Sequence, residues 1–463
     1  MRSVLPALLW LSAAAAPMAL AQPAYSCDPT VCKLPNCTCA SPTPPGGIAP
    51  QQAPQFLMLT FDDALTQDTY DVVTALAGSR KNPNGCPAQI TFYTQTYYTD
   101  PLLVTQLYAR GHEIADHTMS HGAYPGPQKA GVYEYIEYEG NRAFLNRYAG
   151  IPLGKIKGVR FPFLNYSTDA LNMMKKMGFL YDSSMKATGC TDQVNVCGDP
   201  NLKAQGMWEV PLYETGGASG IHLMDPYNDP TITNPISLDT VYSEYASTFD
   251  SHYNGNRAPF GVYTHPVWLT GASTSPNGLN KQATVAKFLD YAMSKPDVWM
   301  ITGSQMVEYM KNPVPASQLG SQPYMQCKNT APTNICNGLG PASLAETCNF
   351  LTGTMHTCYG CPSVVPDIPN PLPSSSSSRY PLPTNCDTLW WDPVAGKCLC
   401  NDASCAYQDQ ARPINFDQGS LDAANSTGNT PSPTGSGKSH AFATSPSSVV
   451  LSVLAFGALA MMI

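Results

Sequence analysis

Three short polar groups in the sequence carry side chains that can bind a metal ion and move protons. They are Asp62 with Asp63, His117 with His121, and His265. A carboxylate with two imidazoles is a ligand set for Zn²⁺ that leaves one position for water, whose pKa then falls to about 7. A second carboxylate can serve as general base and a separate histidine as general acid. Together these groups predict metal-assisted hydrolysis of an unactivated amide.

The spacing within each group divides the roles. Successive side chains of a strand alternate, so Asp62 and Asp63 are expected to point in different directions and do different work. His117 and His121 are four residues apart, which predicts two imidazoles on one face of a helical turn. Each pattern has an ordinary alternative, because adjacent aspartates often lie in solvated turns and histidines are common on surfaces. Their order, each after a predicted strand, favours the metal site.

The elements that must position these groups alternate between strand and helix from residue 55 to 313. Apolar runs predict strands at 55–61, 88–94, 113–116, 156–161, 180–183, 207–212, 260–264 and 298–302. Helical periodicity predicts helices at 67–77, 101–110, 133–148, 168–177, 281–293 and 304–310. This alternation indicates a parallel sheet with crossover helices. Its length fits a (β/α) barrel, in which the active site lies at the C-terminal ends of the strands.

The two ends of the chain carry targeting patterns. Residues 1–21 combine a basic residue, an apolar run and a small-residue cleavage pattern, which predicts a secretory signal peptide rather than a buried helix. The apolar tail 448–463 follows a polar spacer and three small residues, which predicts a GPI-attachment signal. The expected acceptor is Ser436, with Gly435 or Gly437 as alternatives. A hydrophobic C-terminal anchor helix is the other interpretation of the tail.

Composition limits the partners and the compartment. A net charge of −8 argues against a nucleic acid, and the 13% of charged residues suits a surface that meets neutral sugar. Sixteen cysteines in a chain with a signal peptide predict mostly disulfides, with zinc knuckles as the alternative. Candidate glycan acceptors are Asn36, Asn165 and Asn425. The expected location is therefore outside the cell, at the membrane or in the wall.

Composition also divides the chain into six parts. They are the signal peptide 1–21, a Cys-rich lead and linker 22–54, the α/β domain 55–313, a Cys-rich segment 314–414, a Ser/Thr/Gly stalk 415–447 and the tail 448–463. The Pro- and Ser-rich run inside the Cys-rich segment predicts an extended spacer. The stalk holds the predicted GPI site, and attachment would remove the tail.

Several motifs resemble the NodB-homology polysaccharide deacetylases, which are carbohydrate esterase family 4. TFDDA, HTMSH and RFPF resemble the first three family motifs. RKNPNGC, GHEIADHTMSH, GVRFP, FLYDSSM and the lead CDPTVCKLPNCTC are similar, more specifically, to chitin deacetylases of fungi and arthropods. The resemblance covers about residues 55–312. It implies a distorted (β/α) barrel of the NodB type and a metal-dependent deacetylase of N-acetylglucosamine polymers, chitin above all.

The resemblance also assigns roles to individual residues. Asp62 matches the catalytic base, and Asp63, His117 and His121 match the ligands of a divalent metal, Zn²⁺ or else Co²⁺. Arg160 matches the arginine that orients the base, and His265 the general acid. The backbone N–H of Phe163, after Pro162, matches the oxyanion donor. Trp268 and Leu269 match the apolar wall around the acetyl methyl group.

Two departures from the family pattern stand out. The fourth motif, whose aspartate tunes the acid histidine, is not clear, and Asp182 is its best match. Thr264 occupies the place before His265 where the family usually has leucine.

The resemblance leaves other functions open. A sugar-binding wall protein with little turnover is one alternative, and a deacetylase of another acetylated polysaccharide such as xylan or peptidoglycan is a second. The expected partners are chitin or its oligomers and a membrane reached through a GPI lipid, and the sequence does not indicate an oligomeric state.

Overall fold

The computed structural model describes residues 27–122, 130–187, 206–217, 220–225, 237–270, 278–327, 345–388 and 390–398. The predicted signal peptide, stalk and tail, with Asn425 and Ser436, lie outside these residues. Within the described ranges, none of the helices is both long enough and apolar enough to span a membrane.

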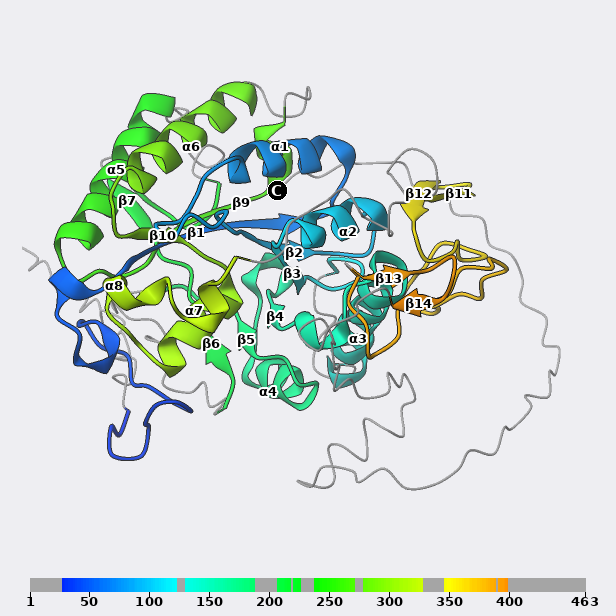
Figure 1. Cartoon of the computed structure of the whole chain (residues 1–463), viewed down its shortest axis with the longest axis horizontal. Helices are drawn as coiled ribbons and strands as arrows, with labels where there is room; N and C mark the ends of the chain where they lie inside the picture. Colours follow the sequence, from blue (N-terminus) through cyan, green and yellow to red (C-terminus); the bar gives the residue numbers. More distant parts are fainter. Residues whose placement is uncertain are drawn as a thin grey trace, which may run out of the picture. The chain divides into compact units, whose positions relative to one another are not determined.

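A parallel sheet of eight strands forms the centre of the fold (Figure 1). The strands are β1 (Gln55–Asp63), β2 (Thr91–Thr94), β3 (Glu113–Asp116), β4 (Gly158–Val159), β5 (Tyr181–Asp182), β6 (Trp208–Glu209), β9 (Phe260–Thr264) and β10 (Val298–Met300). Their order is β10-β1-β2-β3-β4-β5-β6, with β9 on β1. Leu57 is in register with both Phe260 and Met300, so β9 and β10 lie on opposite sides of β1. No pairing among the described strands joins β6 to β9, so the predicted barrel is confirmed in an incomplete form.

Strand β1 is buried along nearly its whole length, which explains its central place. Leu57, Leu59 and Phe61 pack in the larger core, whereas Phe56 and Met58 pack in a second cluster on the other face. Strands of parallel sheets are covered on both faces and therefore carry continuous apolar runs. The run ends at the C-terminal edge of the sheet, where polar side chains can meet.

Helices surround the strands in Figure 1. They are α1 (Gln67–Ala77), α2 (Pro101–Ala109), α3 (Ala130–Ala149), α4 (Thr168–Lys176), α5 (Leu238–Asn254), α6 (Gly278–Met293), α7 (Gly303–Lys311) and α8 (Ala316–Leu319). The six helices predicted from periodicity are all present. Helix α5 is not among the predicted helices, although Val241, Tyr245 and Phe249 recur every fourth residue on its buried face.

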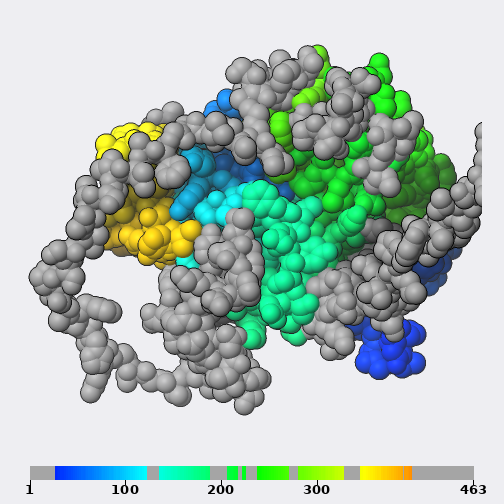
Figure 2. All heavy atoms as spheres, turned by 180° about the vertical axis from the view of Figure 1, so that it is seen from behind, coloured from blue at the N-terminus to red at the C-terminus, as the bar shows by residue number. Residues whose placement is uncertain are grey.

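The C-terminal Cys-rich segment packs on the outer surface of α2. It contains two hairpins, β11 (Glu346–Phe350) with β12 (Gly353–Thr357) and β13 (Trp391–Asp392) with β14 (Lys397–Cys398). Tyr359 and Trp391 belong to one buried cluster with Leu102 and Ala109 of α2. Figure 2 shows this segment, in yellow and orange, against the blue-to-cyan part of the chain.

Polar contacts fix the same segment. Asp100, the N-cap of α2, accepts from Leu102 N at 3.1 Å and contacts His356 Nδ1 at 2.7 Å. The Pro/Ser run predicted to be a spacer is extended but bonded to the first hairpin, since the Ser377 hydroxyl donates to Glu346 at 2.6 Å. The run is therefore part of the folded segment.

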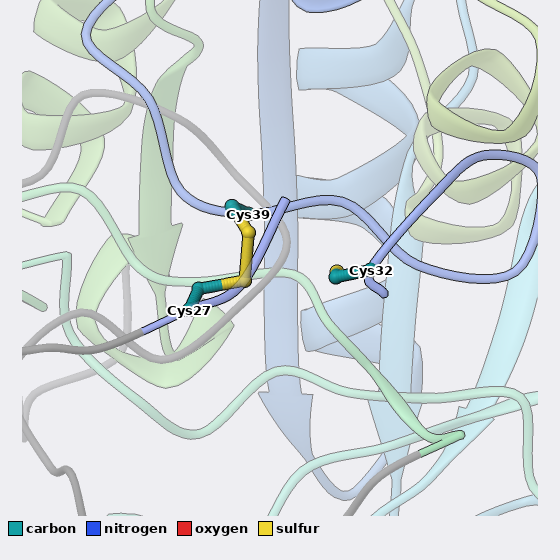
Figure 3. Close-up of side chains that lie close together, drawn as sticks. All are labelled: Cys27, Cys32 and Cys39. Atoms are coloured by element: carbon teal, nitrogen blue, oxygen red, sulfur yellow. A yellow bond between two sulfur atoms is a disulfide. The ribbon is translucent and has the colours of Figure 1, made fainter. Parts of the chain in front are cut away.

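Cysteines in the described residues form disulfides rather than zinc knuckles. The pairs are Cys27–Cys39, Cys32–Cys37, Cys86–Cys327, Cys348–Cys361 and Cys386–Cys398. Cys27, Cys32 and Cys39 lie close enough together to suggest a metal cluster. Figure 3 shows the bond between Cys27 and Cys39 with Cys32 beside it, and Cys32 is bonded to Cys37, so no thiolate remains to bind a cation.

The longest described cross-link should contribute most to stability. Cys86–Cys327 has a sequence separation of 241, against 13 for Cys348–Cys361. The chain-entropy model assigns about 5 kcal/mol to the first loop and about 3 kcal/mol to the second. We expect Cys86→Ala/Cys327→Ala to unfold at a lower urea concentration than Cys348→Ala/Cys361→Ala, followed by tryptophan fluorescence without reductant. Equal midpoints would contradict the entropic account.

Candidate active site

Asp62 and Arg160 form a buried ion pair at the end of β1. Arg160 Nη1 lies 2.6 Å from Asp62 Oδ1, and neither side chain is more than 2% exposed. Burial alone would raise the pKa of Asp62, but the charges of Arg160, His117 and His265 lower it below its usual value. Asp62 therefore stays ionised, as a proton acceptor must. Arg160 Nη1 also donates to Thr60, and Arg160 Nη2 to Ser183, at 3.0 and 2.9 Å.

Asp63, His117 and His121 converge on one point beside this pair. Asp63 Oδ1 lies 3.7 Å from His117 Nε2 and 3.5 Å from His121 Nε2. Ligands about 2.0–2.1 Å from a tetrahedral Zn²⁺ would be separated by about 3.3–3.4 Å. Asp63 Oδ1 is buried, and no hydrogen-bond donor of the described residues reaches it. The three groups therefore fit a divalent cation.

The hydrogen bond on the far side of His117 fixes its tautomer. His117 Nδ1 lies 2.8 Å from the Arg160 carbonyl oxygen, which can only accept, so Nδ1 carries the proton. Burial lowers the pKa of His117 to about 4, although Asp62 and Asp63 oppose the shift. The ring is therefore neutral, and its Nε2 lone pair faces Asp63, as in a metal ligand oriented by a backbone carbonyl.

The segment between the two histidines is a loop, so the predicted helical turn is wrong. Thr118 and His121 have φ values of 70° and 53°, which a right-handed helix cannot contain. The Thr118 N–H donates to Asp116 at 2.9 Å, and the Thr118 hydroxyl accepts from His121 N at 3.0 Å. Side-chain bonds replace the helical ladder and still bring the two imidazoles together, with ring centroids 4.9 Å apart.

His265 follows β9, and its ring faces the second carboxylate oxygen of Asp63, the one that His117 and His121 do not approach. Its Nε2 lies 3.9 Å from Asp63 Oδ2, and its Nδ1 is hydrogen-bonded to Asp225. Burial alone would lower the pKa of His265, but Asp225, Asp63 and Asp62 raise it to about 10. The ring is held protonated, which suits a proton donor.

Asp225, and not Asp182, is the carboxylate that contacts His265. Asp182 is buried and accepts from the Ser184 hydroxyl at 2.6 Å. Asp225 lies after β8 (Gly220–His222), which pairs with β7 (Thr215–Gly217). It was missed because a single Asp-Pro step forty residues before the histidine is a weak signal.

Thr264, which stands where the family usually has leucine, contacts the carboxylate of Asp225. Its hydroxyl donates to Asp225 Oδ1 at 2.6 Å, and His265 N donates to the same oxygen at 3.0 Å. The threonine therefore helps to hold the carboxylate against the imidazole.

The residues predicted to bind the oxyanion and the acetyl methyl group differ in how exposed they are. Phe163 is 62% exposed, has φ 57° and meets the His121 ring at 4.6 Å, while Pro162 before it is buried. Trp268 is partly exposed in the short helix Pro266–Leu269, whose N-cap is His265. Leu269, at the other end of that helix, is buried.

Two of the candidate glycan acceptors can be placed. Asn36 and Asn165 are both exposed, and Asn165 is two residues from Phe163.

Comparison with known proteins gives the class that this fold and site define. Residues 49–181 match the family model for polysaccharide deacetylase. The chain is 32% identical to chitin deacetylase 8 of Bombyx mori over 390 residues, covering 80% of this chain and 98% of the relative. Chitin deacetylase 1 of the same species is 26% identical over 381 residues, 74% of this chain and 68% of that protein. The chain belongs to the polysaccharide deacetylase family and is a deacetylase, an amide hydrolase.

A putative polysaccharide deacetylase from Mycobacterium smegmatis is 17% identical with a TM-score of 0.43, covering 59% of this chain and 95% of that one.

The Asp225–His265 contact should set the alkaline limit of activity. If protonated His265 is the active form, activity falls as pH rises through its pKa. Removing the Asp225 charge lowers that pKa, so Asp225→Asn should move the alkaline limb of kcat/KM down by about one pH unit or more. Asp182→Asn is the matched control and should leave the limb in place. An alkaline limb that stays in place in Asp225→Asn, or that moves equally in the control, would contradict the assignment.

Proposed function

We propose that this protein is a metal-dependent chitin deacetylase that hydrolyses the N-acetyl groups of N-acetylglucosamine residues to give chitosan and acetate. The observation that carries the proposal is the convergence of Asp63, His117 and His121 between an ionised carboxylate and a protonated imidazole. The two named relatives are chitin deacetylases, which supports chitin over other acetylated polysaccharides.

The metal chemistry is assigned to the three converging groups. Asp63, His117 and His121 would hold the cation, with Zn²⁺ preferred over Co²⁺ because the carboxylate and two imidazoles form a catalytic zinc set. A bound cation would polarise the acetyl carbonyl and make water acidic enough to attack at neutral pH.

The chain's own residues would then move the protons. Asp62, kept ionised by Arg160, takes the proton of the attacking water. His265, kept protonated by Asp225, gives its Nε2 proton to the departing amine. The Phe163 N–H is proposed to stabilise the oxyanion, and Trp268 to form the apolar wall beside the acetyl methyl group.

Asp62→Asn should abolish turnover without removing the cation site. We expect acetate release from chitin oligomers to fall by about 10²–10⁴-fold, because the amide cannot accept the proton. Asp239→Asn, the same change at an exposed residue of α5, is the control and should retain full activity. Chelation should abolish release and Zn²⁺ should restore it.

Two results would oppose this mechanism. One is substantial release by Asp62→Asn, and the other is full activity after metal removal has been verified. Faster acetate release from acetylxylan or peptidoglycan than from chitin oligomers would instead show that the substrate is one of these polymers and not chitin. Zinc and chitin binding without acetate release would favour the sugar-binding alternative.

We also propose that the protein is secreted, glycosylated at Asn36, Asn165 and Asn425, and attached to the outer face of the cell membrane, or to the wall, through a GPI lipid on Ser436. The signal peptide, sequons, spacer and apolar tail support this location.

Phosphatidylinositol-specific phospholipase C should release the protein from intact cells that express the full chain. A variant ending at residue 434 should appear in the medium without the enzyme, because it lacks the attachment signal. Retention of the full chain after lipase treatment, with a known GPI protein released in parallel, would show that the tail is a hydrophobic anchor.

A further inference from the structure

The loop that carries His117 and His121 must be held by something other than a helix. Thr118 and His121 are non-glycine residues in the left-handed region, which costs about 1–3 kcal/mol each unless surrounding contacts impose it. The N–H groups of Met119 and Ser120 both donate to Glu137 Oε2, each at 2.9 Å. One carboxylate of α3 therefore gathers the backbone between the two histidines.

Glu137 is itself buried and depends on the loop in return. It is 2% exposed, and its Oε1 accepts from the Ser120 hydroxyl. The arginine five residues along α3, Arg142, pairs with Glu139 at 3.4 Å. A carboxylate in this environment is costly unless donors satisfy it, and three donors from the loop do so. The loop and Glu137 are thus mutually required.

A second contact from α3 fixes the start of the loop. Asn141 Nδ2 donates to the Thr94 carbonyl at 2.8 Å and to Asp116 Oδ1 at 3.0 Å. The same Asp116 oxygen accepts from Thr118 N. Helix α3 therefore braces the loop on both sides of Thr118, and Glu137 supplies the part nearest His121.

We propose that Glu137 is a positioning residue for the metal site. By fixing Met119 and Ser120 it sets the separation and direction of His117 Nε2 and His121 Nε2. The inference rests on the proposed metal site but concerns a residue with no expected contact to cation or substrate.

Two substitutions separate hydrogen bonding from charge. Glu137→Met keeps the length of the side chain and removes both acceptors. Glu137→Gln removes the charge, yet its carbonyl can still receive the two N–H groups while its amide donates to Ser120. Glu244, 6% exposed in α5, offers matched controls in Glu244→Met and Glu244→Gln.

The measurements are the Zn²⁺ dissociation constant, obtained by competition with a chromophoric chelator, and the visible absorption of bound Co²⁺, which reports ligand geometry. We expect Glu137→Met to weaken Zn²⁺ binding about tenfold or more and to change the Co²⁺ spectrum. Glu137→Gln should fall between it and wild type, and both Glu244 variants should match wild type.

Glu137→Met with a wild-type dissociation constant and spectrum would overturn the proposal. If that variant does not fold, Glu137→Gln becomes the test. A Zn²⁺ dissociation constant within twofold of wild type for Glu137→Gln would then overturn the proposal. Wild-type binding and acetate release test the proposed function separately, because the Glu137 inference is judged from the ratio of variant to wild type. A wild-type protein that binds neither Zn²⁺ nor Co²⁺ would overturn both.

Discussion

The completely buried guanidinium of Arg160 is the group on which the rest of the site depends. Its side chain neutralises Asp62, and its carbonyl oxygen fixes the tautomer of His117. The proposed base and one proposed ligand are thus aligned by one residue of the segment after β4. A buried Arg–Asp pair contributes little net stability, because desolvation offsets the attraction, but removing either partner leaves a costly lone charge. The pair is better explained by the orientation that it gives Asp62, the proposed proton acceptor, than by stability.

Much of the fold could be predicted because the elements around β1 obey simple periodicities. The side chains of β1 alternate between two apolar clusters, and α1 spans the same residues, 67–77, that its helical periodicity predicts. The short strands β4, β5 and β6 were predicted too long, because their apolar neighbours continue past the last ladder hydrogen bond. Helix α5 was missed because Ser, Thr and Asp lie between the apolar residues of its buried stripe and make the segment as a whole polar.

The candidate site, like the fold, could be predicted only in part. The grouping of Asp62, Asp63, His117, His121 and His265 could be predicted, because parallel strands bring their C-terminal ends to one edge. Their partners could not, because Asp225 and Glu137 reach the site from a short hairpin and a helix face. Local spacing also predicted a helical turn where the structure has a loop, because Glu137, 17 or 18 residues away in the sequence, holds the backbone of Ser120 and Met119. Sequence pattern thus identifies reactive groups more readily than the groups that hold them.

The contact between α2 and the C-terminal hairpins has a consequence for where this enzyme can be cut. A fragment that stops near residue 313, where the α/β pattern ends, would uncover Leu102 and Ala109 and leave Asp100 without His356. It would also lose Cys327, the partner of Cys86 in the loop before β2. Of the part of the chain that the structure describes, a fragment that keeps these contacts runs on to the end of β14. The catalytic fold and its apparent appendage are therefore one folding unit.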